Sequence, residues 1–209
     1  MITVCWAAKG GSGTTVVAAA MAIAHAGPTL LVDLAGDVPA TLGLPEPDGP
    51  GVLDWLRSEA PASRLAGLEI RALENVSVLP CGQLAPRPTQ RWSELAAWLR
   101  GESRHIVVDA GSACVPPADV VRAADHALLV TRACYLALRA AVRQSARPTG
   151  IVLVEEPGRA LHGDDIAASL GAPVVATVLL DPAVARAVDA GLLIAHLPMG
   201  FRRALQLVA

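Results

Sequence analysis

Lysine and aromatic residues are scarce in this sequence. Of the 17 lysine and arginine residues only Lys9 is a lysine, and phenylalanine and tyrosine occur once each in 209 residues. With aromatic residues at 3% and hydrophobic residues at 53%, the core has to be built mainly from alanine, valine and leucine. A chain that uses arginine at every other basic position indicates that a guanidinium cannot replace the Lys9 ammonium.

A strong net charge, paired cysteines and long apolar runs are lacking too. A formal net charge of -2 and a pI near 6.2 exclude a global electrostatic attraction to nucleic acid. No apolar run approaches the roughly 20 residues that span a bilayer. The cysteines have neither CxxC nor metal-ligand spacing, which predicts a reduced, cytoplasmic protein. They are Cys5, Cys81, Cys114 and Cys134.

The N-terminal segment imitates a signal peptide in part. Lys9 is followed by the apolar run 16–24 and by Ala24-His25-Ala26, which has the form of a cleavage site. Glycine turns interrupt the segment, however, and its one basic residue stands behind an apolar stretch. We therefore expect no signal peptide.

Short apolar runs alternate with segments of helical period along the chain. Runs that are almost continuously apolar are typical of strands buried on both faces of a parallel sheet. The predicted strands are 2–8, 29–34, 76–80, 105–111, 126–131, 150–155 and 173–178. The predicted helices are 14–26, 51–59, 89–100, 117–124, 135–147, 163–170, 182–190 and 200–208. This alternation predicts one α/β domain, residues 1–209, with a doubly wound, mostly parallel sheet between two helical layers.

The junction of the first strand and the first helix carries the strongest motif, KGGSGTT. Glycines let backbone amides surround an anion, and the helix N-terminus adds a partial positive charge. A hydroxyl at the end of such a loop can ligate Mg²⁺. The alternative is a plain tight turn, which would need neither the lysine nor the hydroxyl. The candidate phosphate-binding residues are Lys9, Gly10, Gly11, Ser12, Gly13, Thr14 and Thr15.

This motif resembles the deviant phosphate loop, KGGxGKT[TS], of the MinD/ParA family of P-loop ATPases. The likeness continues in LLVDLAGDVPATLGL (30–44), HIVVDAGS (105–112) and AADHALLVTRACYLALRAA (123–141). Segment 158–191 resembles the branch associated with septum-site and Tad-pilus localisation, the CpaE/TadZ type. The resemblance implies a P-loop NTPase fold that binds ATP or ADP with Mg²⁺. It also implies a homodimer through the nucleotide face, in which Lys9 reaches the partner subunit's nucleotide.

Three positions depart from the family pattern. Thr14 replaces the loop lysine that contacts the outer phosphates, and Ala35 replaces the second acid after the second strand. Glu155 stands near the place where the family often reads adenine with an asparagine. Charged hydrogen bonds to phosphate are commonly worth about 1.5 to 3 kcal/mol each. We therefore expect nucleotide binding to survive and hydrolysis to be slow or absent.

Two aspartates end neighbouring predicted strands, at the sheet edge where open α/β folds bind ligands. Asp33 and Asp109 could hold Mg²⁺ through water together with Thr15, and the resemblance gives both aspartates and Lys9 catalytic roles. The alternative for each aspartate is a cap on a turn or helix. Asp37 could replace the acid missing at Ala35, or could simply form a turn.

Arginines repeat at a spacing of four in the predicted helix 135–147. Arg139, Arg143 and Arg147, with Arg132 before them, could contact DNA phosphates or an acidic partner. The alternative is a solvated helix face, and the negative net charge does not favour DNA.

The C-terminal segment 198–209 holds the one phenylalanine beside Arg202 and Arg203. It could form a helix that contacts a membrane weakly. The alternative is a terminal helix packed on the sheet, because two arginines give little attraction to anionic lipid.

These features together predict a nucleotide-binding localisation scaffold of the partitioning, septum-site or pilus-assembly type. Its partner would be a protein of a localisation or assembly machine that recruits it to a pole, septum or membrane. Three alternatives stay open: an active ATPase that positions cargo, a segregation protein that binds plasmid or chromosomal DNA, and a nucleotide-free interaction module on the same fold.

Overall fold

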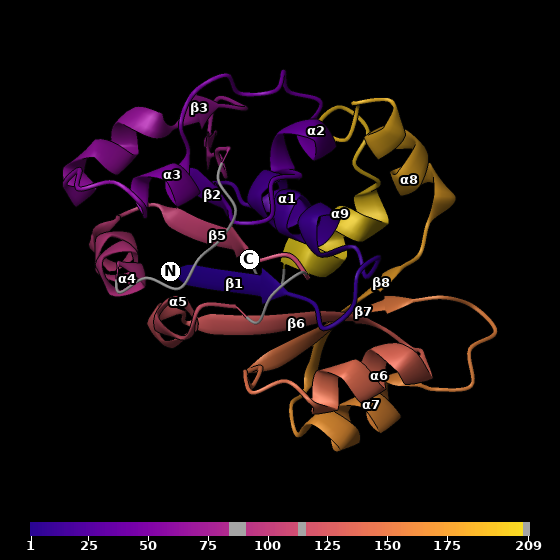
Figure 1. Cartoon of the computed structure of the whole chain (residues 1–209). Coiled ribbons are helices and arrows are strands. Elements are labelled where there is room, and N and C mark those ends of the chain that lie inside the picture. Colours follow the sequence, from indigo (N-terminus) through magenta and orange to yellow (C-terminus); the bar gives the residue numbers. More distant parts are fainter. Residues whose placement is uncertain (84–90, 113–115, 207–209) are drawn as a thin grey trace.

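The computed structural model describes residues 1–83, 91–112 and 116–206, and a single sheet forms its centre (Figure 1). Within these residues eight strands lie in the order β3-β4-β2-β5-β1-β6-β7-β8. Neighbouring strands are parallel, except that β3 is antiparallel to β4. The strands are β1 (Ile2–Trp6), β2 (Thr29–Asp33), β3 (Ile70–Arg71), β4 (Val76–Leu79), β5 (His105–Asp109), β6 (His126–Arg132), β7 (Gly150–Glu155) and β8 (Val174–Leu179).

The strands form where the sequence is almost continuously apolar. Every predicted strand is present, and its ends lie within two residues of the predicted ones. β1, β2 and β5 are buried at every residue, because helices cover both faces of the sheet. The sequence did not predict β3, since two residues carry no readable period.

Helices form one layer on each face of the sheet (Figure 1). α1, α2, α8 and α9 contribute to the core on one face, and α3 to α7 contribute on the other. The predicted doubly wound, three-layer α/β fold is therefore confirmed. The helices are α1 (Thr14–Ala24), α2 (Val38–Leu42), α3 (Val52–Trp55), the 3₁₀ helix η1 (Ala62–Leu68), α4 (Trp92–Gly101), α5 (Ala118–Ala123), α6 (Tyr135–Val142), α7 (Gly163–Leu170), α8 (Pro182–Asp189) and α9 (Met199–Gln206).

The core on each face follows the two-residue alternation of the strands. On β1, Cys5 joins the cluster on the α1 face, whereas Val4 and Trp6 join the cluster beneath α3, α4 and α5. α1 is buried along most of its length because it packs on the sheet and has α2 and α9 as neighbours. Its run of alanines lets it lie close to both neighbours.

α3 is shorter than the predicted helix 51–59. After Trp55 the backbone changes to bonds of the i to i−3 type, in which the Arg57 amide donates to Asp54 and the Ser58 amide to Trp55. Such bonds tighten the last turn and end the helix. The Ser58 hydroxyl also donates to the Trp55 carbonyl, at 2.9 Å.

α6 ends at Val142, so the prediction of a helix over 135–147 was wrong at its C-terminal end. Beyond Arg143 the Gln144 amide donates to the carbonyl three residues earlier. Pro148 disfavours the helical conformation for Arg147, because its ring clashes with the preceding residue. The helical pattern of the sequence therefore continues to residue 147, whereas the helix itself ends at Val142.

α2 and η1 were not predicted, since both lie in stretches rich in proline and glycine. α2 ends at Gly43, which has a left-handed backbone with φ of 71°. A Cβ atom on Gly43 would stand 2.0 Å from the carbonyl oxygen of Gly191, at the end of α8. The end of α2 is therefore in backbone contact with the C-terminal part of the chain.

Two predicted helices extend beyond the described residues. α4 begins at Trp92 rather than at residue 89, and residues 84–90 lie outside the described part. α9 covers the predicted helix 200–208 up to Gln206, and residues 207–209 lie outside it. Cys114 also falls outside the described residues.

Candidate functional site

The loop between β1 and α1 has the backbone that an anion site requires. Gly11 and Gly13 are left-handed, with φ of 75° and 85°, which a residue with a side chain rarely adopts. The Ser12 hydroxyl donates to the Lys9 carbonyl at 2.8 Å and closes the loop. No side chain caps the N-terminus of α1. The first amides of an 11-residue helix are therefore available to a phosphate.

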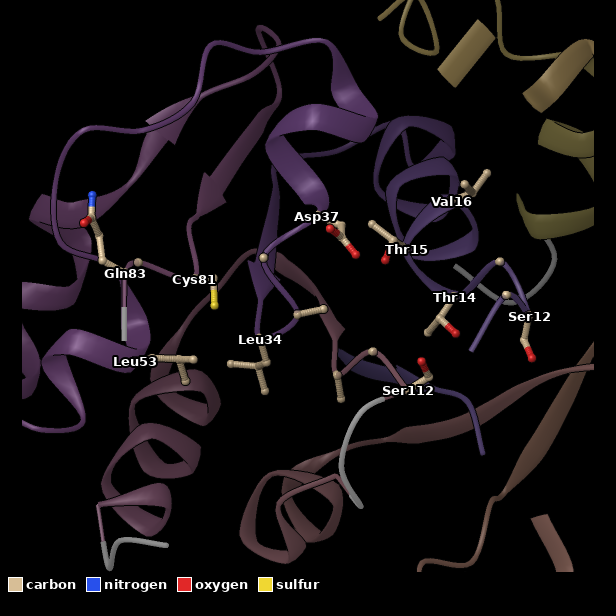
Figure 2. A pocket seen from close by; sticks show the side chains of 17 residues that line it. Ser12, Thr14, Thr15, Val16, Leu34, Asp37, Leu53, Cys81, Gln83 and Ser112 are labelled. Atoms are coloured by element: carbon tan, nitrogen blue, oxygen red, sulfur yellow. The ribbon is translucent and has the colours of Figure 1, made fainter. Parts of the chain in front are cut away.

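A cavity of about 610 Å³ opens beside this loop (Figure 2). Thr14 and Thr15 enter it from α1, and Figure 2 shows Asp37 approaching Thr15 from the loop after β2. Leu34, Leu53 and Cys81 gather at the opposite end. The cavity thus has a polar end at the phosphate loop and an apolar end beneath α3.

Asp33 and Asp109 lie side by side, as the sequence predicted. They are register partners at the carboxyl ends of β2 and β5, and both are fully buried. The two carboxylates differ in the number of backbone amides among the described residues that donate to them, one for Asp109 and three for Asp33.

The two carboxylate oxygens of Asp109 differ in their surroundings. Its Oδ1 accepts from the Gly111 amide at 3.0 Å, whereas Oδ2 is buried without a hydrogen-bond partner. Burial raises the pKa of Asp109 to about 6, and the neighbouring Thr15 hydroxyl acts in the opposite direction. A buried carboxylate oxygen beside a threonine hydroxyl fits a hard cation such as Mg²⁺. The donor set at this point is therefore suited to the metal that the sequence predicted.

Asp33 is occupied by its own loop. Its carboxylate accepts from the amides of Ala35 at 2.9 Å, Gly36 at 2.7 Å and Val38 at 3.2 Å. Burial raises the pKa of Asp33, and these three amides lower it. The structure thus has the turn-capping arrangement that the sequence left as an alternative. A role for Asp33 in metal binding stays a prediction.

Thr14 and Ala35, two of the departures from the family pattern, both face the cavity. Thr14 is 6% exposed, and its side chain is too short to extend along a phosphate chain as a lysine would. The Ala35 Cβ lies 2.9 Å from the place where a Cβ on Gly111 would stand. Asp37, two residues after Ala35, is the one acid among the described residues that line the cavity.

Lys9 and Glu155 lie outside the cavity. Lys9 is exposed, and its ammonium makes no hydrogen bond or ion pair with any described residue. Glu155 ends β7 opposite Leu179, and its carbonyl accepts from the Leu180 amide at 2.7 Å. Val154, next to it, is 4.0 Å from the Cβ position of Gly13, so β7 ends beside the phosphate loop. The structure therefore brings Thr14 and Thr15 to the cavity and Thr15 to the buried Asp109, whereas Lys9 and Glu155 do not line the cavity.

The far wall of the cavity was not predicted from the sequence. Cys81 and Gln83 follow β4, and the Asp54 carboxylate fixes that turn by accepting from the amides of Gly51 at 2.8 Å and Gln83 at 3.1 Å. Burial raises the pKa of Cys81 to about 12, so the thiol stays protonated and unreactive at neutral pH. The turn signal at Gly82, with φ of 88°, was readable in the sequence, but its position beside α3 was not.

The proposed arginine stripe does not exist as one helix face. Arg139 lies on α6, Arg143 is its C-cap, and Arg147 lies beyond its end. Arg132 is engaged in an ion pair with Glu156 at 2.5 Å, and Glu156 also binds Arg159. These arrangements remove the geometric basis for a continuous DNA-binding face.

The end of the chain packs on the body of the protein up to Gln206. Leu205 of α9 is fully buried, and the Gln206 amide group donates to the Ala24 carbonyl at 3.2 Å. This agrees with the packed alternative for the described part of the C-terminal segment. No helix among the described residues is long and apolar enough to cross a membrane. No cluster of three or more His, Cys, Asp or Glu side chains in the same residues could hold a metal ion.

No protein-family model matches the sequence, and no curated protein matches it. Solved structures match the fold. The MinC:MinD cell division protein complex of Aquifex aeolicus gives a TM-score of 0.80 at 20% identity, over 99% of this chain and 93% of that chain. The septum site-determining protein MinD of Pyrococcus horikoshii, complexed with Mg-ADP, gives 0.76 at 18% identity over 100% and 94%. A ParA family ATPase of Chlorobium tepidum gives 0.72 at 18% identity over 98% and 96%. The chain therefore has the fold of MinD/ParA-type P-loop proteins.

Proposed function

We propose that this protein is a nucleotide-binding localisation scaffold of the MinD/ParA type, in the CpaE/TadZ-like branch, with slow or absent hydrolysis. The observation that carries the proposal is the uncapped glycine loop at the start of α1, where the Thr15 hydroxyl lines the cavity next to the buried Asp109 carboxylate. The loop amides and α1 would bind the phosphates of ATP or ADP. Thr15 and Asp109 would hold Mg²⁺, which neutralises phosphate charge when it is bound.

The same cavity supports slow turnover. Phosphoryl transfer depends on positioned charge around the outer phosphate. At this place the chain has Thr14 instead of a lysine and Ala35 instead of an acid, and Asp33 is committed to its own loop. Binding can rest on backbone amides and the metal, whereas the groups that would stabilise the transition state are depleted.

Exposed Lys9 supports a homodimer through the nucleotide face. It stands at the carboxyl edge of the sheet without a partner in its own subunit's described residues. A flexible ammonium at this edge can reach the phosphates of a nucleotide held by a second copy. Nucleotide-dependent dimerisation would then be the signal that a partner protein of a localisation machine reads.

Thermal unfolding with Mg-ATP, Mg-ADP and Mg²⁺ alone tests the proposal. A ligand that binds only the native state adds about 2.7 kcal/mol to the free energy of unfolding at 100 times its Kd, and so raises the melting temperature. We expect a clear shift with millimolar nucleotide and none with Mg²⁺ alone. A Thr15→Val variant, which removes the hydroxyl and keeps the side-chain shape, should lose most of the dependence on Mg²⁺.

Two readings compete with this proposal, and each predicts a different result. A nucleotide-free interaction module shows no thermal shift with any nucleotide. A working ATPase that positions cargo shows the shift together with steady-state turnover at ordinary ATPase rates, about 1 per second or more. Binding without such turnover supports the scaffold.

A further inference from the structure

A second cavity lies at the opposite edge of the sheet from the phosphate loop. It has a volume of about 770 Å³ and lies at the amino ends of β2, β4 and β5, beside the C-terminus of α1. Its polar lining includes His25, Asn75, Ser77 and Arg202. None of these residues contributes to the site described above.

Arg202 is the least satisfied charged group at this cavity. It lies on α9, and its Nη2 donates to the Ile23 carbonyl at 3.2 Å. Its Nε is buried and has no hydrogen-bond partner, and the guanidinium makes no ion pair with any described carboxylate. Because Nε is closed to solvent, only the rest of the guanidinium can meet a ligand in the cavity, and no carboxylate among the described residues neutralises its charge.

A second unsatisfied polar group, the His105 ring, lies close by. His105 is 6% exposed, and neither of its ring nitrogens has a hydrogen-bond partner. Its ring stacks on His25, with 4.3 Å between centroids and 21° between planes. His25 itself lines the cavity. The imidazole pair therefore extends the polar surface from the cavity into the sheet.

The other charges around the cavity leave Arg202 as the uncompensated cation. Arg104 also lines it, but its guanidinium is bound by Glu69 at 2.7 Å and by Glu102 at 2.9 Å. Glu74 is the one carboxylate among the described lining residues, and it is exposed, so it can turn toward solvent. The cavity therefore presents one free guanidinium to an incoming group.

We propose that this cavity binds a small oxyanion, the phosphate or carboxylate group of a metabolite, which accepts a hydrogen bond from the Arg202 guanidinium. The Ser77 hydroxyl and the His25 ring line the same space and can donate to its remaining oxygens. Ile23, Leu73 and Ile194 form an apolar wall that can receive a short carbon skeleton. This inference does not depend on nucleotide binding at the other edge.

Occupation of the cavity would fasten α9 to α1. Arg202 already joins the two helices through the Ile23 carbonyl, and an anion bound to its guanidinium would hold the same side chain from the cavity. Because α1 begins at the phosphate loop and ends at this cavity, one rigid helix connects the two edges. The anion would thus stabilise the C-terminal helix on the helix that carries the candidate nucleotide site.

The test uses inorganic phosphate and citrate against sodium chloride of equal ionic strength, with thermal unfolding and hydrogen exchange as readouts. We expect either anion to raise the melting temperature and to slow exchange at residues 23–28 and 199–206. Arg202→Gln removes the charged contact, so the affinity for the anion should fall by about tenfold or more and the response should weaken accordingly. Arg203→Gln, on the exposed side of the same helix, is the matched control and should respond like the parent protein.

Exchange also separates the two edges of the sheet. Protection confined to residues 9–15 would mean that phosphate binds only the loop and would overturn the inference, as would an unchanged response in Arg202→Gln. If Arg202→Gln fails to fold, Glu74→Gln serves instead: removing this exposed carboxylate should strengthen the anion response. A response that stays equal or weakens in Glu74→Gln contradicts the proposal. A response to phosphate alone, to citrate alone or to both shows whether the cavity takes a phosphate group, a carboxylate group or either.

Discussion

Ala35 and Gly111 touch where the loops after β2 and β5 meet. The Ala35 Cβ lies 2.9 Å from the place where a Cβ on Gly111 would stand, and Gly111 has φ of 64°. The same glycine donates its amide to Asp109 and accepts from the Ala7 amide, at 3.0 Å and 2.8 Å. The two loops, which both line the candidate nucleotide site, therefore leave no room for a side chain at Gly111.

Gly111→Ala should therefore destabilise the protein more than strain alone explains. A left-handed backbone costs a residue with a side chain about 1 to 2 kcal/mol. Gly158 has φ of 82° and nothing within 4 Å of its Cβ position, so Gly158→Ala measures that strain alone. We expect a larger loss of unfolding free energy in urea for Gly111→Ala. Equal losses would show that the contact with Ala35 relaxes freely.

Thr14→Lys should tighten nucleotide binding. The change restores a charge at a buried position that faces the cavity, and such contacts are commonly worth about 1.5 to 3 kcal/mol, or about tenfold to a hundredfold in Kd. Titration with Mg-ADP measures the effect. Thr177→Lys, on an exposed position of β8, is the control and should leave the Kd unchanged. A weaker affinity in Thr14→Lys would indicate that the loop cannot accommodate the longer side chain.

Lys9→Ala should abolish nucleotide-dependent dimerisation and leave binding by the monomer largely intact. The reason is that Lys9 is exposed and lies outside the cavity of its own subunit. Light scattering and nucleotide titration on the same variant separate this from a local role, in which Lys9 folds back onto its own nucleotide and the Kd rises by about tenfold or more. A parent protein that stays monomeric with saturating Mg-ATP would contradict the interface role.

Asp109 should make the ligand-free protein less stable as the pH rises from about 4 to 6. Burial raises the pKa of Asp109 to about 6, so between its unfolded and folded pKa values the native state binds more protons. The loss amounts to about 2 kcal/mol. Asp109→Asn keeps an acceptor for the Gly111 amide and should lack this loss, so it should gain stability above pH 6. Chemical denaturation from pH 4 to 7 measures the difference.

His105 should act in the opposite direction over the same pH range. Burial, followed by the charges of His25, the N-terminal amine and His126, lowers the pKa of His105 to about 4. The unfolded chain therefore binds more protons between pH 4 and 6.5, and stability falls as the pH falls through this interval. His105→Phe, which keeps a ring against His25, should lose this dependence of about 2 kcal/mol. A denaturation profile that matches the parent protein would show that His105 is hydrated in solution.

The regular part of the fold could be predicted because burial on both faces leaves a simple pattern. β1, β2 and β5 have no polar face, so their apolar runs were read correctly. β3 and α2 were too short to show a period, and the end of α6 depends on Pro148 rather than on hydrophobic spacing. The bounds of these three elements therefore depend on short-range backbone constraints that a hydrophobic pattern does not show.

The candidate site was predictable where a continuous motif or the end of a strand marks it. The phosphate loop is continuous in the sequence, and Asp33 and Asp109 follow from their positions at strand ends. Leu53 and Cys81 could not be assigned to the cavity, because they reach it through the Asp54 hydrogen bonds that join α3 to the turn after β4. The commitment of Asp33 to three amides depends on the path of its loop, which spacing does not encode.

The close approach of Gly43 and Gly191 limits how the loop after β2 can move. A Cβ on Gly43 would stand only 2.0 Å from the Gly191 carbonyl oxygen, so at this point there is backbone against backbone and no side chain to compress. The loop can swing away from the end of α8, but it cannot advance toward it. The direction of any ligand-driven displacement of residues 34–43 is therefore set by the steric contact before a ligand arrives, and hydrogen exchange at residues 190–193 would record it as loss of protection only.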